Sequence, residues 1–392
     1  MMLGQEMKNP GFSIPAELMR EFAEFSGLVP PGSVQNRYLW TDAFAVCNFL
    51  ELYRQTNDEN FKNLSLLLVD QVHSVLGRHR GDDRRGGWIS GLDEREGQLH
   101  PTIGGLRIGK QMNERGPYDP FDEQLEWDRD GQYYHYLTKW MHALNRTNSI
   151  TGNPVYGRWA VELARTAYAK FTYASTSNQK RMYWKMSIDL SYPLVPSMGH
   201  HDPLDGLITC CDLQAGLDEA QELPDLTGEI EGLAVMCMGK DWATDDPLGI
   251  GGLLSDAFRA AKMIARGSFQ YENLLVEMLE ACRTGLDAYS LTGSLEAPAH
   301  YRLPFRELGL SIGLHALERL MRLIEKRPHA FEKMDSLAGR VDILMRYRAL
   351  AEIIENFWLD PANRKAPTFT GHRDINTVML ATSLAPDGYL GI

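Results

Sequence analysis

Nearly the whole chain carries the hydrophobic spacing of α-helices, with apolar residues recurring every three to four positions. One set of segments is amphipathic, with one apolar stripe and charged residues on the opposite face. Such helices typically cover a core and keep one face in solvent. The predicted outer helices are Pro15–Phe25, Asn60–His79, Tyr156–Tyr173, Leu223–Met238, Tyr271–Tyr289 and Arg340–Trp358.

A second set of segments alternates with the first and is apolar around most of the helix circumference. A helix of this kind must be covered by neighbours on several sides, so these segments are predicted to form an inner layer. They are Thr41–Gln55, Arg129–Asn145, Pro203–Ala215, Pro247–Ala265, Pro304–Leu320 and Asp374–Ser383. Six inner and six outer helices in alternating order, although unevenly spaced, predict six helical hairpins that share one core.

Three of the connections that lead into inner helices are long and compositionally unusual. They span residues 77–125, 175–202 and 290–304. Connections beyond about 15 residues are uncommon in compact domains unless they are functional or disordered. The alternation in RIGK and RMYWKMSID, and the pair Trp88 and Ile89, indicates short β-hairpins within them. Because all three precede an inner helix, we expect them to gather at one mouth of a ring, and we place the functional site there.

Composition narrows the class of protein. With 392 residues, of which 44% are hydrophobic, the chain can bury a large core without metals or disulfides. The five cysteines show no disulfide spacing. No basic and apolar leader opens the sequence, and no apolar run is long enough to span a bilayer. We therefore expect a cytoplasmic protein.

The net charge of −12 limits the partners that the chain can bind. Nucleic-acid affinity comes largely from Lys and Arg that neutralise phosphates, so nucleic acid is not an expected partner. An acidic protein is also repelled by an anionic membrane surface. The charge instead favours a neutral or weakly charged small molecule.

The start of the second inner helix, EWDRDGQYYHYLTKW, carries the densest group of acids and aromatic residues. Neighbouring carboxylates raise one another's pKa, which can keep one of them protonated as a general acid. Asp128 and Asp130 are therefore candidate catalytic residues. Trp127 and Tyr134 are candidate substrate-binding residues, because flat aromatic faces stack on sugar C–H groups. The alternative is that Asp128 caps a helix and Asp130 pairs with Arg129 or another surface cation.

The start of the third inner helix, MGHHDPLDGLITCCD, supplies a second acidic group. Asp202 and Asp205 are three residues apart and share a helical face with His201. The two acids are further catalytic candidates, and His201 is a candidate for binding a hydroxyl. The alternative is that Asp202, which precedes Pro203, is an N-cap. No histidine or cysteine spacing matches a known zinc motif, so no metal or other cofactor is predicted.

The remaining inner-helix starts also carry polar residues, in RYLWTDAF, ATDDPLGIGG, APAHYRLPFRELG and TGHRDINT, and Asp246 directly precedes Pro247 as a candidate helix cap. Trp40, Asp42, His300, Arg302 and His372 are candidate substrate-binding residues. The arginine cluster can hold a carboxylate through a guanidinium fork. In each case the competing interpretation is a helix cap or a local ion pair.

Two further sets of side chains are interpreted as structural. His135 and His142 lie seven residues apart on one predicted helical face, which is more typical of core histidines. Cys210 and Cys211 are more often small buried hydrophobes than nucleophiles.

The layout of six alternating hairpins, with polar residues at every inner-helix start, resembles the six-hairpin glycosidase superfamily. The resemblance covers almost the whole chain and rests on layout rather than on a catalytic motif. It implies an all-α (α/α)6 toroid with a single domain over residues 1–392. It also implies a glycosidase-like hydrolase that acts on a carbohydrate by paired carboxylates. Asp128 or Asp130 would take one role and Asp202 or Asp205 the other.

Two alternatives remain open. The chain is also similar in layout to the N-acylglucosamine 2-epimerase group, which uses the same toroid for proton transfer at a sugar carbon. In that case His201, His300 and His372 would do the acid–base work. The third alternative is a non-catalytic helical scaffold that binds a ligand through the same mouth.

Overall fold

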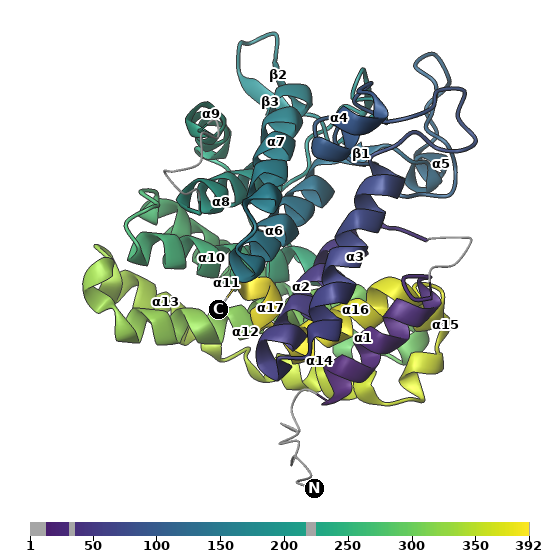
Figure 1. Ribbon diagram of the computed structural model, residues 1–392. Helices are drawn as coiled ribbons and strands as arrows, with labels where there is room; N and C mark the ends of the chain where they lie inside the picture. The colour runs from purple at the N-terminus through teal and green to yellow at the C-terminus, as the bar shows by residue number, and fades with distance from the viewer. Residues whose placement is uncertain (1–12, 31–35, 217–224, 392) are drawn as a thin grey trace, which may run out of the picture.

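In the computed structural model, which describes residues 13–30, 36–216 and 225–391, six helices form an inner layer (Figure 1). They are α2 (Leu39–Thr56), α6 (Tyr134–Thr151), α8 (Asp202–Ala215), α10 (Pro247–Ala265), α12 (Pro304–Lys326) and α16 (Arg373–Leu384). Each packs against the next in chain order, and α16 also packs against α2, so the layer closes into a ring. The predicted (α/α)6 toroid is confirmed.

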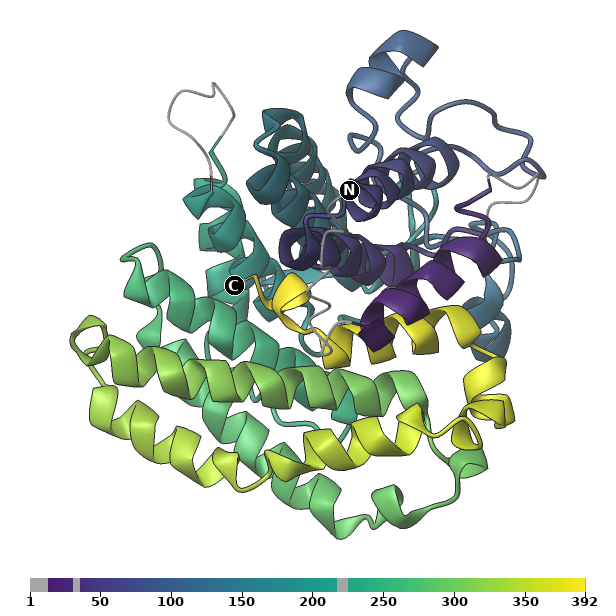
Figure 2. The ribbon, with the colours of Figure 1, turned by 60° about the horizontal axis from the view of Figure 1, so that its bottom comes forward.

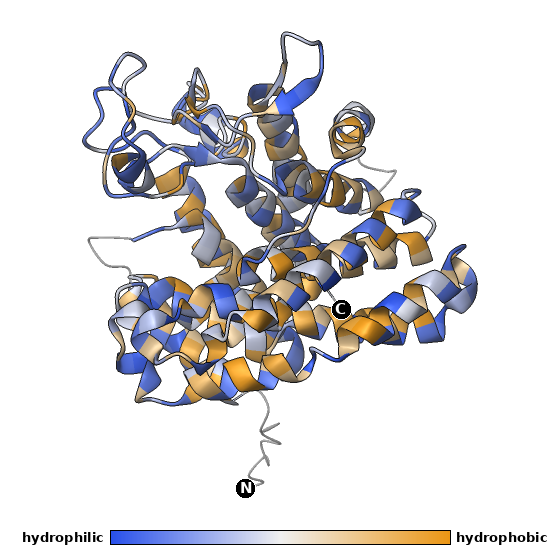
Figure 3. Cartoon of the chain, turned by 180° about the vertical axis from the view of Figure 1, so that it is seen from behind, coloured by the Kyte–Doolittle hydropathy of each residue, from blue (hydrophilic) through white to orange (hydrophobic). Residues whose placement is uncertain are grey.

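An outer helix packs against each inner helix. The outer helices are α1 (Ser13–Phe25), α3 (Glu59–Leu76), α7 (Pro154–Phe171), α9 (Thr227–Cys237), α11 (Glu272–Leu291), α13 (Met334–Met345) and α14 (Ala349–Leu359). Burial follows the sequence pattern, since every residue of α2 from Leu39 to Leu52 is buried, whereas α3 buries mainly one stripe. Figure 3 shows the apolar stripes on the helices and the more polar long loops.

Two predicted helices differ most from the observed ones. The predicted inner helix Arg129–Asn145 begins only at Tyr134, because Gly131 has a φ of 147° and packs against the Met186 carbonyl, where a Cβ would lie 2.7 Å from the oxygen. The predicted outer helix Arg340–Trp358 is two helices, α13 and α14, which lie beside α12 (Figure 2). The first two residues of the predicted helix Leu223–Met238 lie outside the described residues.

Short strands and helices lie in the long connections. Strands β1 (Gln132–Tyr133), β4 (Lys185–Met186) and β5 (Pro193–Val195) form one antiparallel sheet, and β2 (Thr172–Ala174) pairs with β3 (Lys180–Met182). The strand prediction is confirmed for RMYWKMSID (residues 181–189), which contains the last two residues of β3 and all of β4. The segment RIGK (residues 107–110) forms no strand. The short helices are α4 (Glu94–Leu99), α5 (Glu123–Asp128), α15 (Pro367–Thr370), α17 (Asp387–Leu390) and the 3₁₀ turns Ser294–Glu296, Ala299–Tyr301, Pro328–Ala330 and Asn363–Lys365.

The end of the ring at which the inner helices finish is closed by α17. Lys262, near the end of α10, donates hydrogen bonds from Nζ to the carbonyls of Leu390 (2.7 Å) and Gly391 (2.9 Å). Arg146, near the end of α6, donates to the Gly388 carbonyl at 3.1 Å. These cations satisfy carbonyls that a helix end leaves without partners. The opposite end, where the inner helices begin, is therefore the open one.

Among the helices of the described ranges, none combines the length and the apolarity needed to cross a lipid bilayer.

Candidate active site

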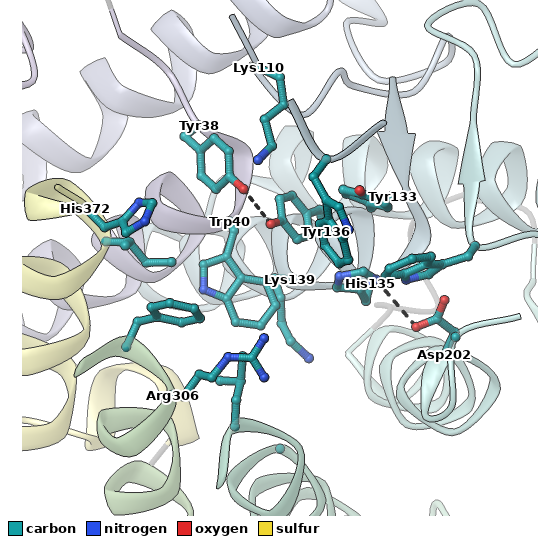
Figure 4. A pocket seen from close by; sticks show the side chains of 18 of the residues that line it. Tyr38, Trp40, Lys110, Tyr133, His135, Tyr136, Lys139, Asp202, Arg306 and His372 are labelled. Carbon is teal, nitrogen blue, oxygen red and sulfur yellow. Dashed lines mark hydrogen bonds and ion pairs between the residues drawn. The ribbon is translucent and has the colours of Figure 1, made fainter. Parts of the chain in front are cut away.

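A cavity of about 1350 Å³ opens at the end of the ring where the inner helices begin. The first turns of all six inner helices contribute to its lining, so side chains from distant parts of the chain point into one space (Figure 4). One lining residue from each helix, in chain order, is Trp40, His135, Asp202, Leu248, Phe305 and Ile375. The predicted convergence of the inner-helix starts on a shared cavity is confirmed.

Two of the three long connections also line the cavity. The first contributes Arg107 and residues 109–112, and the second contributes Trp184 and residues 199–202. The third, residues 290–304, contributes none of the lining. The third connection folds into two 3₁₀ turns and ends at Pro304, directly before the lining residues Phe305 and Arg306.

The structure brings seven of the predicted site residues together around the cavity and leaves five outside its lining. Those that line it are Asp128, Asp202, Asp205, Trp40, Trp127, His201 and His372. Those that do not are Asp130, Asp42, Tyr134, His300 and Arg302.

Asp130 is fully buried and anchors a loop. Its carboxylate accepts hydrogen bonds from Arg107 at 2.7 Å, from Arg80 at 3.4 Å and from the Gly109 backbone N–H at 3.0 Å. A buried carboxylate with this many donors is already paired. Of the two acids proposed from the second inner-helix start, Asp128 is the one that lines the cavity.

Asp42 and Tyr134 are held within the wall of the ring. The Asp42 carboxylate, in the first turn of α2, accepts the backbone N–H of the N-cap residue Tyr38 at 3.0 Å and lies 3.5 Å from Arg37. Tyr134 is 1% exposed, and its ring packs against Phe171 at 5.5 Å. Both face the helix packing rather than the cavity.

Arg302 and His300 lie beside α12 and away from the cavity. The Arg302 guanidinium forms a buried, bidentate pair with Glu307, with its Nη2 2.6 Å from Oε2. This pair realises the local alternative considered for the arginine. His300 is exposed and packs on Tyr301, at 4.1 Å between ring centroids.

Two carboxyls of α8 lie at the cavity wall in different environments. Asp205 is fully paired, because its Oδ1 accepts from Lys139 Nζ at 2.8 Å and its Oδ2 accepts from Thr138 Oγ1 at 2.5 Å. Asp202, at the first turn of the same helix, has no hydrogen-bond partner for Oδ2 among the described residues. Its Oδ1 lies 3.5 Å from His135 Nδ1.

These environments separate the protonation states of the two carboxyls. Burial opposes ionisation of Asp205, but the Lys139 ammonium and the hydrogen bonds hold its pKa below the usual value. Burial and the nearby negative charge of Asp205 raise the pKa of Asp202 to about 8. Burial, followed by the Asp205 charge, likewise raises the pKa of Asp256, deeper in the cavity, to about 6. At neutral pH, Asp202 therefore keeps its proton beside an ionised Asp205.

Two histidines of the cavity are neutral. Burial lowers the pKa of His135 and of His201 to about 4. His201 Nε2 lies 2.9 Å from the Trp242 carbonyl oxygen. A carbonyl can only accept, so Nε2 carries the proton and Nδ1 keeps its lone pair.

No family model and no curated protein matches this sequence. Solved structures do match it along nearly its whole length. A GH76A α-1,6-mannanase from Salegentibacter sp. is 11% identical with a TM-score of 0.53, over 96% of this chain and 99% of that one. A D-mannose isomerase is 12% identical with a TM-score of 0.53, over 98% and 100% of the two chains. A cellobiose 2-epimerase from Spirochaeta thermophila is 11% identical with a TM-score of 0.50, over 98% and 99%.

The chain has the fold of these proteins. The (α/α)6 fold predicted from the resemblance to the six-hairpin glycosidase superfamily is thus confirmed. Identities near one residue in nine establish the fold and leave the chemistry to be argued from the cavity.

Several polar residues of the cavity are missing from the sequence-based candidates. His135 lines the cavity, so its interpretation as a core histidine is wrong, whereas His142 is buried and bonded to the Tyr389 carbonyl at 2.6 Å, as that interpretation predicts. Lys139 lies one turn beyond His135, and Arg306 and Lys110 lie at a helix start and in the first long loop. The signal that finds His135 and Arg306 is their place in the first turn of an inner helix.

The described residues contain no group of three or more His, Cys, Asp or Glu side chains arranged to hold a metal ion.

Proposed function

We propose that this protein is a carbohydrate-active enzyme that hydrolyses a glycosidic bond in the cavity, with Asp202 as the proton donor. The observation that carries the proposal is a buried carboxyl in the cavity wall whose pKa is raised to about 8, one helical turn from the ionised Asp205. Strongly perturbed carboxyls in a cleft are typical of acid–base sites. The fold neighbours support the substrate class, since their names all denote carbohydrate enzymes.

Asp202 meets the chemical requirements of a general acid. A glycosidic oxygen is a poor leaving group unless it receives a proton as the bond breaks. Asp202 holds that proton at neutral pH, and its Oδ2 has no protein partner among the described residues. Asp205 supports this role without donating a proton itself. Its two oxygens accept hydrogen bonds from Lys139 and Thr138, and its negative charge favours the protonated form of Asp202.

Asp128 is our candidate for the second carboxylate. It lines the cavity from the end of α5, and its side chain makes no hydrogen bond or ion pair within the described residues. It is exposed, so water reaches it. An accessible carboxylate of this kind suits a general base that activates water. Trp40, Trp127 and His372 would bind the saccharide around the two acids.

The size and walls of the cavity favour a glycoside over a single sugar. Small-molecule sites usually enclose roughly 300–1,000 Å³, and this cavity has about 1350 Å³. Aromatic faces from Trp40, Tyr133, Tyr136 and Trp184 alternate in its lining with carboxyl and imidazole groups. Such a lining matches a sugar, which has apolar C–H faces and a polar rim.

A second candidate is epimerisation or isomerisation of a sugar. It is favoured by His201, whose Nε2–Trp242 bond leaves Nδ1 free to accept a proton at the cavity wall. His372 also lines the cavity, whereas the third histidine of that hypothesis, His300, does not. A purely ligand-binding scaffold has no need of a protonated buried carboxyl, which costs folding energy at neutral pH.

One experiment separates these functions. The protein is incubated in heavy water with a panel of p-nitrophenyl glycosides, and separately with reducing mono- and disaccharides. Hydrolysis releases p-nitrophenol and places no deuterium on carbon. Epimerisation or isomerisation releases no phenol and incorporates deuterium at a sugar carbon. We expect phenol release; deuterium incorporation alone would replace the first function by the second, and neither signal would reject both.

A further inference from the structure

An aromatic series runs from the outer edge of the cavity to Asp202. Trp127 contacts Trp184 edge-on, with ring centroids 5.4 Å apart, and Trp184 lies 5.3 Å from Tyr133. Tyr133 in turn lies 5.3 Å from His135, whose Nδ1 is 3.5 Å from Asp202 (Figure 4). All five side chains line the cavity. The series thus gives one wall of the cavity a continuous aromatic surface.

The outer member of the series is exposed. The Trp127 residue is 49% exposed although it lines the cavity, and the neighbouring lining residue Met112 is 40% exposed. A single exposed apolar residue needs no explanation, but an indole that continues an aromatic wall outward is a feature of ligand-binding surfaces. Trp127 therefore extends the wall beyond the enclosed part of the cavity.

A buried ion pair joins the two chain segments that carry Trp127 and Trp184. Lys185 Nζ lies 2.9 Å from Glu126 Oε1 and also donates to the Glu126 carbonyl at 2.7 Å. Glu126 directly precedes Trp127, and Lys185 directly follows Trp184. Arg115 is the third member of this buried cluster, and its Nε donates a hydrogen bond to Glu126 Oε2 at 3.2 Å. Burying such charges costs free energy unless close pairing and further hydrogen bonds offset the loss of hydration.

The consequence is an exposed indole, Trp127, that packs against the half-buried indole of Trp184 on a rigid support. The Lys185 and Glu126 side chains are 0% and 5% exposed, so the pair is sheltered from solvent and salt. Fixing aromatic side chains in advance lowers the entropy lost when a ligand binds. This is the property expected of a binding platform and is not needed for a surface loop.

We propose that Trp127 and Trp184 form a second sugar-binding subsite at the rim, so that the substrate is an oligosaccharide that extends from Asp202 to Trp127. The inference rests on the proposed function, because it requires a sugar in the cavity. The steps of 5.3–5.4 Å between ring centroids are on the scale of one sugar ring. A saccharide chain is thin enough to follow the aromatic wall from the rim into the enclosed cavity, whereas a folded protein surface is not.

The test compares chain lengths in W127A, W127F and the unaltered protein. Affinities are measured by calorimetry for α-1,6-linked mannose oligomers and β-1,4-linked glucose oligomers of one to four units. The control is Y118A, since Tyr118 is 99% exposed in the same loop and does not line the cavity. We expect the unaltered protein and Y118A to bind the tetramer of at least one series more tightly than the monomer. W127A should reduce that preference about two- to tenfold, the range of one aromatic contact, and W127F should retain part of it.

Four results would overturn the inference. Equal affinity for every chain length, or a chain-length preference that survives in W127A, removes the subsite and leaves the proposed function standing. Self-association of the protein that W127A abolishes would assign the exposed indole to a protein contact. Binding of no oligomer from either series would reject the subsite, and would reject the proposed function with it only if no p-nitrophenyl glycoside is hydrolysed either.

Discussion

The ammonium nitrogen of Lys139 lies 2.8 Å from Oδ1 of Asp205, and both residues line the cavity. This pair keeps a negative charge on α8 in a place where burial would otherwise neutralise it. Burial, followed by this charge, raises the pKa of Asp202, three residues earlier on the same helix. Burial and the ion pair together thus maintain one ionised and one protonated carboxyl at the cavity wall.

Replacing Lys139 by Met should destabilise the protein by about 3–5 kcal/mol, because it leaves a buried carboxylate without its counter-charge. Urea unfolding followed by circular dichroism measures the change. The double variant K139M/D205N serves as the control, since it removes both charges and should recover part of the loss. A K139M variant as stable as the unaltered protein would show that the pair does not hold the charge of Asp205.

Replacing Asp202 by Asn should lower kcat/KM about 10²- to 10⁴-fold, the usual contribution of a general acid, without altering the fold. The amide has nearly the same shape but cannot deliver a proton to a leaving oxygen. The matched control is D245N, because Asp245 is an exposed aspartate before α10 that does not line the cavity. Equal turnover by D202N and D245N would remove Asp202 from the mechanism.

Gly199→Ala should reduce activity by displacing the Asp202 carboxyl. A Cβ at Gly199 would lie 2.3–2.5 Å from the three carboxyl atoms of Asp202, closer than real contacts allow. The control is Gly86→Ala, a loop glycine where an added Cβ meets nothing within 4 Å. We expect kcat/KM to fall about tenfold or more in G199A, since small misplacements of a reacting group are costly, and to be unchanged in G86A. Full activity of G199A would mean that the carboxyl position is not important.

The stability of the protein should fall between about pH 6.5 and 8 because of Asp202. Its folded pKa of about 8 exceeds the usual 3.8, so the folded state binds the extra proton and loses that advantage as the pH rises. His135 and His201, with pKa values lowered to about 4, act in the opposite direction, but only below about 6.5. Over this window D202N should gain about 1–2 kcal/mol on the unaltered protein, as measured by urea unfolding at each pH. Parallel pH curves for the two proteins would contradict the raised pKa.

The ring and its mouth could be predicted from the sequence because they rest on local patterns. Asp202–Pro203 and Asp246–Pro247 mark inner-helix starts, and the observed helices α8 and α10 begin at Asp202 and Pro247. Closure then places all such starts around one cavity. Which of two neighbouring acids lines the cavity is not decided locally. Asp130 lies outside the lining because its carboxylate accepts a hydrogen bond from Arg107, 23 residues earlier in the chain.

His135 illustrates the same limit. Helical periodicity places it on one face with His142, seven residues later, and both are therefore predicted to be core residues. The structure separates them along the axis of the ring, because His135 lies at the cavity and His142 contacts Tyr389 of α17 at the other end. Periodicity gives the face of a helix, whereas the depth at which a side chain lies depends on the ring as a whole.

The most direct test of the protonated Asp202 is infrared difference spectroscopy of the unaltered protein against D202N across pH 5–9. A protonated carboxyl has a carbonyl stretch well separated from the bands of a carboxylate. We predict a carbonyl band that is absent from D202N and disappears with a midpoint near pH 8. A band that is already lost at pH 5 would show that Asp202 is ionised at neutral pH and is not the proton donor of this cavity.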